Sequence, residues 1–338
     1  MRIRLSVLGL LGAAGAVACA ATLLGWLGRF SWILDLFSHF RLQYLLGLGL
    51  AGVVFLAARR LKTAALFFAF ASINLCVLAP FYFGGGGRGV VDGSVRPLRA
   101  MLINVNSRLG DKDRVRQVIH ETDPDFVVLE EITSRWLLDL RWLLDSHPHS
   151  CVQTREDNFG IGLFSKMPLD EGKIVSIGEI GVPSILATIA TDQGQLRVVA
   201  THPPPPAGGE YSRWRNDQLD RLPDHIRSPL PLILLGDLNV TPWNHHFKRL
   251  IERTGLIDSS RGRGIGPTWP TYNPFLLIPI DHCLHSAEIT VVEKYNGEGV
   301  GSDHFPVIVD FVIGARPLAP GTVPREAPAR QSIRDGDR

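Results

Sequence analysis

The sequence has 338 residues, with 35 Lys and Arg against 33 Asp and Glu, which gives a formal net charge of +2. This length suits one large domain and an additional segment. The nearly neutral charge gives no overall attraction to nucleic acid, and it neither supports nor excludes a nucleic-acid substrate. The 4 cysteines form no CxxC pair and no Cys/His metal spacing, so a thiolate-bound metal is not expected. A disulfide between Cys151 and Cys283 is left open.

The N-terminal part of the chain is apolar. Residues 5–27 contain no charged residue, and residues 43–58 and 63–83 form two further apolar runs. As a helix, residues 5–27 would be about 35 Å long, enough to cross a hydrocarbon core of roughly 30 Å. In lipid, helices satisfy the backbone hydrogen bonds without leaving an exposed edge. We therefore expect residues 1–83 to form a membrane anchor of three transmembrane helices.

The first apolar run has an alternative interpretation as a cleaved signal peptide. Arg2 and Arg4 precede it, and Ala16-Val17-Ala18 stands before Cys19 as a weak cleavage signal. Two further apolar runs follow, however, whereas a signal peptide normally precedes soluble sequence. The anchor is therefore the favoured interpretation.

Basic residues suggest the orientation of this anchor in the cell membrane. Arg59, Arg60 and Lys62 crowd the short loop after the second run, and basic residues also precede the first run. The positive-inside rule then places both in the cytoplasm, and with three spans the C-terminal domain lies outside it. Arg88, Arg96 and Arg99 follow the third run and argue the other way.

The rest of the chain divides into three parts. Residues 84–97 are rich in glycine and predict a flexible linker. Residues 98–314 have the composition of a globular domain. Residues 315–338 are rich in Pro, Arg and Ala, lack periodicity and are expected to be disordered.

The globular part alternates between two periodicities. Apolar runs predict strands at 99–105, 126–130, 160–165, 185–190, 196–201, 231–236, 278–284 and 306–312. Apolar residues at helical spacing predict helices at 112–122, 134–144, 211–226 and 243–253. Because strands outnumber helices, we expect an α/β domain of two packed sheets with helices outside.

Polar residues that can bind metal recur at the ends of these strands. They are Asn104 and Asn106, Glu130 and Glu131, His202, Asp237 and Asn239, Asp281 and His282, and Asp303 and His304. So many in one domain predict that the strand ends converge on a common polar cleft. Carboxylate and amide oxygens without cysteine favour a hard cation, Mg²⁺ or Mn²⁺. Two histidines add acid–base catalysis, so metal-assisted attack of water on a phosphoester is the simplest chemistry.

The motifs in this order resemble the endonuclease/exonuclease/phosphatase superfamily, in its bacterial membrane-anchored form. The resemblance covers about residues 99–313 and rests on Ile103-Asn104-Val105-Asn106, Leu129-Glu130-Glu131-Ile132, Thr201-His202, Gly236-Asp237-Leu238-Asn239, Ile280-Asp281-His282 and Gly301-Ser302-Asp303-His304-Phe305-Pro306. It implies a four-layer α/β sandwich, with two mixed sheets between helices and the site at one end. It also implies a divalent metal and hydrolysis of a phosphoric ester.

The resemblance assigns roles to the matching residues. Asn104 and Glu131 match metal ligands, and Asp303 matches a metal-binding or orienting carboxylate. Asp237 and Asn239 match the pair that orients the attacking water and holds the phosphate or a second metal.

Two histidines and their partner complete the assignment. His304 matches the histidine that contacts the scissile phosphate, and Asp281 matches the acid that orients it. His202 matches a second histidine, a candidate general acid for the leaving oxygen. Weaker candidates for contact with the substrate are Arg213, Arg215, Asn216 and Trp269.

Three functions compete at this point. The first is a membrane-anchored nuclease or general phosphodiesterase. The second is a phospholipase C or phosphoinositide phosphatase that acts on phospholipid head groups. The third is a non-catalytic binding domain, which the complete set of ligand residues disfavours. The expected partners are the phosphoester substrate and the lipid bilayer, and no protein partner is evident.

Overall fold

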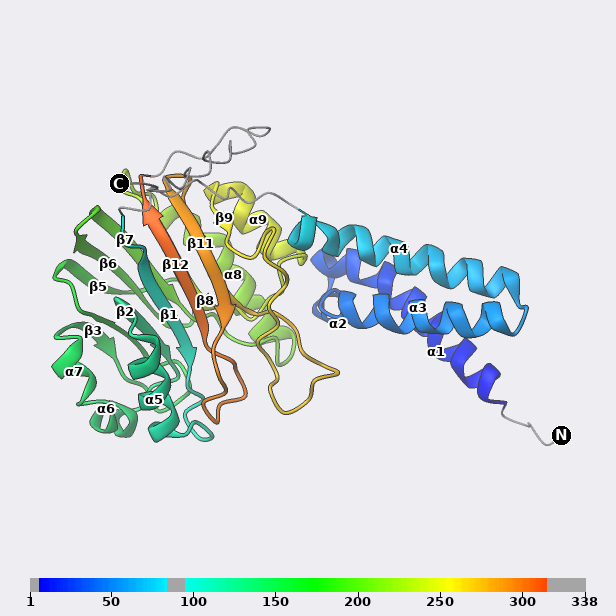
Figure 1. Ribbon diagram of the computed structural model, residues 1–338, viewed down its shortest axis with the longest axis horizontal. Helices are drawn as coiled ribbons and strands as arrows, with labels where there is room; N and C mark the ends of the chain where they lie inside the picture. Colours follow the sequence, from blue (N-terminus) through cyan, green and yellow to red (C-terminus); the bar gives the residue numbers. More distant parts are fainter. Residues whose placement is uncertain (1–5, 84–94, 315–338) are drawn as a thin grey trace, which may run out of the picture.

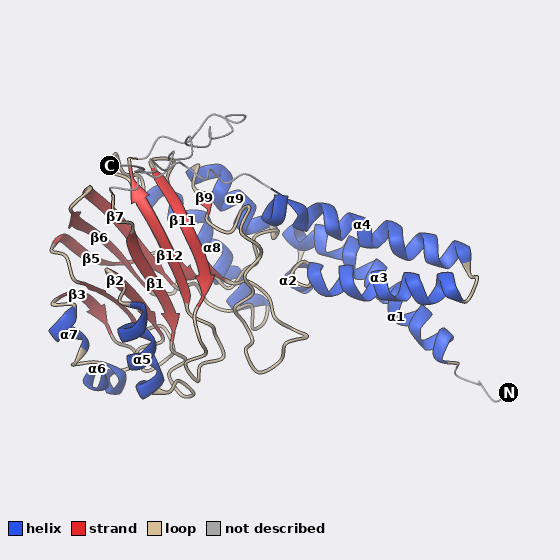
Figure 2. Cartoon of the chain, viewed as in Figure 1, coloured by secondary structure: helices blue, strands red, loops and turns tan. Residues whose placement is uncertain are grey.

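The computed structural model describes residues 6–83 and 95–314. Two six-stranded mixed sheets pack face to face, with helices on their outer faces (Figures 1 and 2). This arrangement confirms the predicted four-layer sandwich. The predicted tail, 315–338, and nearly all of the predicted linker, 84–97, lie outside the described residues.

The first sheet contains both chain ends of the sandwich. Its order is β11 (Ile289–Asn296), β12 (Val307–Ile313), β1 (Leu98–Asn104), β2 (Phe126–Glu130), β4 (Ile161–Ser165) and β3 (His149–Gln153). β1 and β2 run parallel, with Asn104 opposite Glu130, so their carboxyl ends meet at one edge. The outer face is covered by α5 (Lys112–Thr122), α6 (Ser134–Asp139) and α7 (Leu143–Ser146).

The second sheet brings its polar strand ends to the same end of the molecule. Its order is β5 (Leu169–Ser176), β6 (Pro183–Thr191), β7 (Gly194–Thr201), β8 (Leu232–Asp237), β10 (Asp281–His285) and β9 (Ile257–Asp258). β7 and β8 are parallel, and β10 is antiparallel to β8, with Asp281 opposite Asp237. Helices α8 (Gly209–His225) and α9 (His245–Thr254) cover the outer face.

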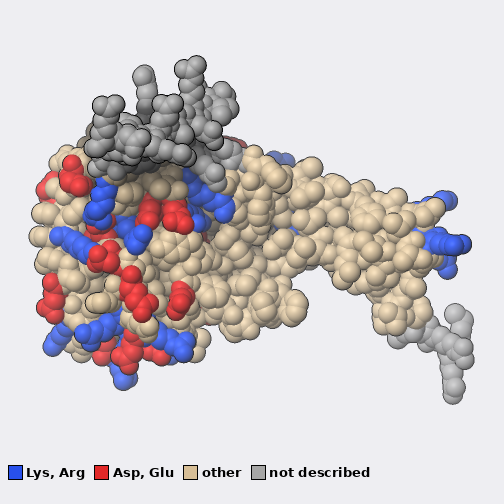
Figure 3. All heavy atoms as spheres, viewed as in Figure 1, with Lys and Arg blue, Asp and Glu red and all other residues tan. Residues whose placement is uncertain are grey.

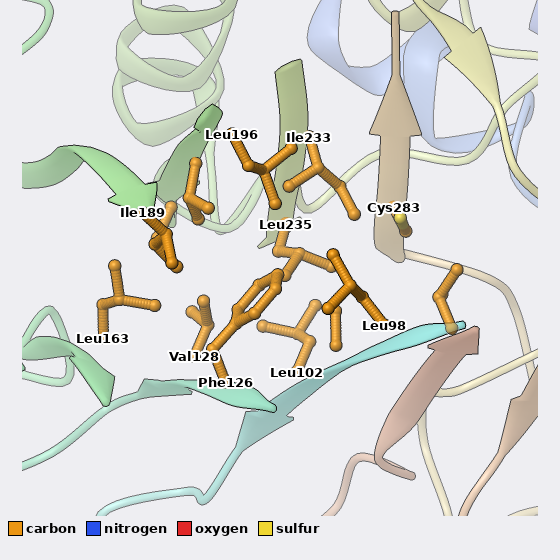
Figure 4. Close-up of a cluster of buried hydrophobic side chains, with 14 of the residues drawn as sticks. Leu98, Leu102, Phe126, Val128, Leu163, Ile189, Leu196, Ile233, Leu235 and Cys283 are labelled. Atoms are coloured by element: carbon orange, nitrogen blue, oxygen red, sulfur yellow. The ribbon is translucent and has the colours of Figure 1, made fainter. Parts of the chain in front are cut away.

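The core between the sheets is built from alternate residues of each strand. Leu98, Ala100 and Leu102 of β1 face Ile233 and Leu235 of β8 across the interface (Figure 4). All five side chains are at most 1% exposed. Because side chains alternate across a strand, the next position on each inner face lies at the open end of the sandwich.

The predicted elements differ from the structure in two respects. Four strands were not predicted, β3, β5, β9 and β11, and most of the residues of β3 and β5 are partly exposed, so they carry no continuous apolar run. The helix predicted at 134–144 was wrong in extent. It is broken into α6 and α7 after Asp139.

An arm of apolar helices projects from one side of the sandwich (Figure 1). It consists of α1 (Val7–Leu24), α3 (Arg41–Ala57) and α4 (Leu61–Phe83), with the 3₁₀ helix η1 (Gly25–Phe30) and the short α2 (Trp32–Leu36) at the junction. Only two of the described helices, Val7–Phe30 and Leu61–Phe83, are long and apolar enough to cross a membrane. The third, α3, has 17 residues, so three full spans are not clearly supported.

A polar cluster lies inside the arm. Arg41 donates hydrogen bonds to the Thr22 carbonyl (2.8 Å) and to the Asn74 Oδ1 atom (3.3 Å). The Asn74 amide in turn donates to the Thr22 hydroxyl at 3.0 Å. All three side chains are buried, so these groups join the three helices to one another.

The junction between arm and sandwich is also closely packed. Phe81 of α4 meets Trp243 edge to face, with ring centroids 5.9 Å apart. Arg215 of α8 is completely buried and donates to the Asp35 carboxylate of α2 at 2.6 Å. The same arginine donates to the backbone carbonyl of Asn239 at 3.1 Å. The arm therefore contributes a charged group to the interior of the globular part.

Candidate active site

A polar pocket of about 340 Å³ opens where the strand ends of both sheets meet. Its lining residues are Asn106, Glu131, Asp157, Asn158, Phe159, His202, Pro205, Tyr211, Asp237, Asn239, Trp269, Asp303 and His304. Asn104 and Asp281 lie directly beneath, in contact with lining residues. All eight residues assigned from the sequence to metal binding or catalysis therefore meet in one place.

Strand alternation explains why these side chains converge. The inner face of β1 continues from Leu102 to Asn104, and that of β8 continues from Leu235 to Asp237. By the same count of two, Glu130, His202 and Asp281 extend the inner-face positions of β2, β7 and β10. The apolar core thus changes to polar residues at its open end.

One group of side chains centres on Asn104. Its amide nitrogen donates to the Glu131 Oε1 atom at 3.1 Å and to the Asp237 Oδ2 atom at 3.3 Å. Ser107 holds the other Glu131 oxygen through its backbone N–H at 3.3 Å. The Asn104 amide nitrogen thus brings the Glu131 and Asp237 carboxylates together, while its oxygen accepts the backbone N–H of Asn106 at 3.0 Å. Two carboxylates brought this close are typical of a site for a hard cation.

A second group centres on His304. Its Nδ1 atom lies 2.9 Å from the Asp281 Oδ2 atom, and its Nε2 atom lies 3.7 Å from the Asp237 Oδ2 atom. The His202 Nε2 atom approaches the same Asp237 oxygen at 3.6 Å. Asp237, Asp281 and His304 offer ligand atoms within 4.8 Å of one another. Since Asp281 and His304 already bond to each other, we interpret them as an oriented pair.

Asp303 is fixed from both sides. The Asn106 amide donates to its Oδ1 atom at 2.7 Å, and the Trp269 Nε1 atom donates to its Oδ2 atom at 2.9 Å. The carboxylate lies in the pocket lining with its orientation set by these two donors. Trp269 thus has a defined role in the site as a support for Asp303.

The backbone around the pocket is strained. Six described non-glycine residues have positive φ, and four of them line the pocket: Asn106, Glu131, Asn158 and Asn239, with φ between 45° and 68°. Such conformations cost of order 1–3 kcal/mol each and persist where the surrounding contacts enforce them. Their concentration here indicates that side-chain direction in the pocket takes precedence over local backbone energy.

Burial and charge set the protonation states. Burial alone would lower the pKa of His304, but the Asp281 and Asp237 carboxylates raise it to about 10, so this imidazole carries a proton at neutral pH. Burial, with the His304 charge adding to it, lowers the pKa of His202 to about 3. Burial and the Asp281 charge raise the pKa of Asp237 well above its usual value. Burial also raises the pKa of Glu131.

The weaker sequence candidates fare differently. Arg213 is exposed, does not line the pocket and pairs with Glu210 at 3.7 Å. Arg215 is buried and pairs with Asp35 of the arm, so it is neither at the phosphate nor on a solvated helix face, the two alternatives left open by the sequence. The Asn216 amide oxygen accepts a hydrogen bond from this arginine at 2.8 Å, and Asn216 is also absent from the pocket lining. Cys151 and Cys283 are free.

Some residues in and beside the pocket had no role assigned from the sequence. Glu130 is completely buried between the sheets, and its Oε2 atom accepts the backbone N–H of Asp237 at 3.0 Å. Burial and the Asp237 charge raise its pKa well above the usual value. Its position on the inner face of β2 follows from the alternation of side chains along the strand, because Phe126 and Val128 face the core. Asp157, Asn158, Phe159 and Tyr211 come from loops and a helix start without such a signal.

Comparison with known proteins agrees with this geometry. A sequence model described as the Endonuclease/Exonuclease/phosphatase family matches residues 101–304, more than half of the chain. No curated protein matches the sequence.

Several solved structures share the fold. The endonuclease/exonuclease/phosphatase from Beutenbergia cavernae DSM 12333 has a TM-score of 0.55 and 23% identity, covering 67% of this chain and 74% of that chain. The human Nocturnin catalytic domain, solved with a bound sulfate anion, has a TM-score of 0.53 and 18% identity, covering 65% and 96%. D. rerio TDP2 complexed with a single-strand DNA product has a TM-score of 0.53 and 18% identity, covering 64% and 98%.

The match covers every strand-end motif from Asn104 to His304, and the two packed sheets carry those residues to one pocket. The chain belongs to the endonuclease/exonuclease/phosphatase family and is a phosphoric ester hydrolase.

Proposed function

We propose that this hydrolase is a membrane-anchored phosphodiesterase that requires a divalent cation, Mg²⁺ or Mn²⁺. The observation that carries the proposal is the convergence of Asn104, Glu131 and Asp237 beside the protonated His304. A cation position next to a fixed positive donor suits a substrate that carries a phosphate.

The donor atoms fit a hard cation. Asn104, Glu131 and Asp303 would hold it through oxygen atoms, without a thiolate. Four acids line the pocket, and Asp157 pairs with Arg155. Among the described lining residues, the other three, Glu131, Asp237 and Asp303, have His304 as their charged counterpart. When bound, a divalent ion would polarise a phosphoryl oxygen and offset this crowding of carboxylates.

The residues themselves suggest the chemical step. Asp237, as a carboxylate, would take a proton from the water that attacks phosphorus opposite the leaving oxygen. The backbone N–H of Asn239 holds the Asp237 Oδ1 atom at 2.9 Å for this purpose. His304, held by Asp281, would donate a charged hydrogen bond to a phosphoryl oxygen.

For His202 we propose a role different from the general acid suggested by the sequence. A general acid must carry a proton near neutral pH, and a pKa of about 3 leaves His202 neutral. We assign it instead a neutral hydrogen bond to the substrate, since it lines the pocket with its Nε2 atom 3.6 Å from the Asp237 Oδ2 atom.

Membrane attachment is supported by the surface of the arm. In the most apolar 18-residue stretch of each long helix, only 22% (Val7–Phe30) and 33% (Leu61–Phe83) of the residues are buried. The core helix of a soluble protein is mostly buried. On the face seen in Figure 3, charge is nearly absent from the arm except for basic residues at its far end. Arg59 and Arg60 lie there, between α3 and α4, which favours a cytoplasmic far end and an extracytoplasmic hydrolase.

The test uses the full chain, because the arm contributes Asp35 to the folded interior. Purified protein in detergent is assayed against DNA, RNA, bis(p-nitrophenyl) phosphate and phospholipid, with Mg²⁺ or Mn²⁺ and with EDTA. We expect metal-dependent release of product that falls at least roughly a hundredfold in Glu131→Ala, Asp237→Ala and His304→Ala, with the fold retained. Equal turnover in EDTA, or in all three variants, would refute the mechanism. Absence of any hydrolysis would favour the binding-domain alternative.

A further inference from the structure

A second hollow, of about 360 Å³, adjoins the polar pocket. Unlike that pocket, it is lined chiefly by apolar side chains. Its walls are Leu36, His39, Phe40, Pro205, Pro206, Ala207, Asn239, Trp269, Ile278 and Ile280. We call it the apolar groove.

The apolar groove is continuous with the polar pocket. Pro205, Asn239 and Trp269 line both hollows. Trp269 divides its contacts between them, because its Nε1 atom donates to Asp303 in the pocket while the residue also forms part of the groove wall. A single ligand could therefore place a phosphate in the pocket and a hydrocarbon group in the groove.

One wall of the groove comes from the arm. Leu36 ends α2, and His39 and Phe40 follow it. The His39 Nδ1 atom lies 3.1 Å from the Thr241 hydroxyl, which ties this wall to the sandwich. Gln43, at the start of α3, donates to the backbone carbonyl of Leu277 at 2.9 Å. The groove therefore lies where the proposed membrane-spanning helices meet the hydrolase.

The neighbouring loop, residues 259–280, carries exposed apolar side chains. It connects β9 to β10 and projects on the same side of the sandwich as the arm (Figure 1, gold). In this loop Tyr272 and Phe275 are 72% and 82% exposed, and Leu276 is 44% exposed. Exposed aromatic residues beside a transmembrane segment are typical of contact with the membrane interface.

The lining charges argue against a nucleic acid. Of the described residues that line the two hollows, none is Lys or Arg, and several are acidic. Proteins that bind a nucleic-acid backbone neutralise successive phosphates with Lys and Arg. A ligand with one phosphate and a long apolar portion does not need a row of Lys and Arg, because burial of its hydrocarbon stabilises binding independently of charge.

We infer that the apolar groove is the subsite for the hydrocarbon chain of an amphiphilic phosphodiester, a phospholipid taken from the membrane that holds the arm. The inference rests on the proposed phosphodiesterase function. It adds the chemical class of the substrate and the residues that select it.

The experiment measures how turnover depends on chain length. The full chain, held in an amphipathic polymer with Mg²⁺, is given p-nitrophenyl alkyl phosphodiesters with ethyl, hexyl and dodecyl groups. Water cleaves the bond from phosphorus to the aryl oxygen, releasing p-nitrophenolate and the alkyl phosphate. We expect kcat/KM to rise up to roughly two- to fourfold per methylene until the groove is filled.

Two variants and a matched control locate the effect. Leu36→Asp places a charge in the groove, and Ala207→Trp fills it from its exposed rim. Leu138→Asp alters an exposed leucine of α6, on the far side of the sandwich from the arm (Figure 1). The ratio of kcat/KM for dodecyl to that for ethyl should fall at least tenfold in both groove variants and persist in the control. An equal ratio in all forms, or no rise with chain length in the unaltered protein, would overturn the inference.

Binding separates this inference from the proposed function. Dodecylphosphonate and ethylphosphonate are titrated calorimetrically into the same proteins, below the micelle concentration. The groove assignment stands if dodecylphosphonate binds more tightly than ethylphosphonate and Leu36→Asp removes the difference. If, at the same time, no diester is hydrolysed, the phosphodiesterase assignment fails. Equal binding of the two phosphonates refutes the groove assignment whatever the turnover.

Discussion

Replacing Asp35 with alanine should destabilise the whole protein. Arg215 is completely buried and Asp35 is 2% exposed, with 2.6 Å between the paired atoms. Burial alone would raise the pKa of Asp35, but Arg215 holds it below the usual value. The substitution would leave a buried guanidinium with only the neutral acceptors Asn239 and Asn216. Removing one partner of a buried pair costs about 3–5 kcal/mol.

The double variant Asp35→Leu with Arg215→Met tests the physical reason. If the cost arises from an uncompensated charge, removing both charges should recover most of it, because apolar replacements of buried pairs are often neutral or better. Asp139→Ala is the control, since it breaks the exposed pair with Lys112 and should cost less than about 1 kcal/mol.

The assay is thermal unfolding of the full chain in detergent, followed by circular dichroism and tryptophan fluorescence. A loss of 3–5 kcal/mol corresponds to a fall in the midpoint of roughly 6–20 °C for a domain of this size. The same variant should lose turnover, because Arg215 also holds the Asn239 carbonyl at the pocket. The reasoning fails if Asp35→Ala behaves like the control, or if the double variant loses as much as both single variants combined.

Substitutions at three other residues follow from the site and its surroundings. Asp281→Asn should lower the pKa of His304 from about 10, since the carboxylate raises it. The alkaline loss of kcat/KM should then begin at lower pH, and an unmoved profile would exclude protonated His304 from catalysis. Burial lowers the pKa of His39 from 6.5 to about 4, so the unfolded chain binds a proton between these values that the folded chain does not. Stability should fall by up to about 3 kcal/mol as pH drops through this window, and thermal unfolding of His39→Gln should show a smaller loss. Glu130→Gln keeps the acceptor for the Asp237 N–H and should retain turnover within about threefold, whereas Glu130→Ala should lose about tenfold, in line with the 1–3 kcal/mol cost of an unpaired buried donor. Equal activity of these two variants would dismiss the positioning role of Glu130.

Most of the site could be predicted because it follows strand alternation. Ile233 and Leu235 occupy the inner face of β8 in the core. Two positions further along the same face is position 237, so Asp237 reaches the pocket. The same count predicts Glu130 as a buried neighbour, and only its pairing with a backbone N–H required the structure.

The edges of the sheets were harder to predict. No residue of β3 or β5 is fully buried, and both strands contain polar or charged residues. An apolar run is the signal for a buried strand, so strands stabilised mainly by backbone pairing with one neighbour leave little trace in the sequence.

The junction with the arm could not be predicted at all. Asp35 and Arg215 are separated by 180 positions, Asp35 within the apolar stretch Trp32–Phe37 and Arg215 in a polar helix. From the sequence, Arg215 could reach phosphate or lie on a solvated helix face, because it opens a helix beside the proline-rich loop. Its actual partner, Asp35, is on α2 of the arm, which packs against α8.

The Asp35–Arg215 pair also sets an order of events during synthesis. Asp35 leaves the ribosome 180 residues before its partner, a delay of roughly 10–40 s at typical elongation rates. During that interval the nascent arm holds a carboxylate without its counter-ion at the edge of the apolar segment. The arm is thus incomplete until α8 has folded, and a truncated chain would present an unneutralised acid where the finished protein presents none.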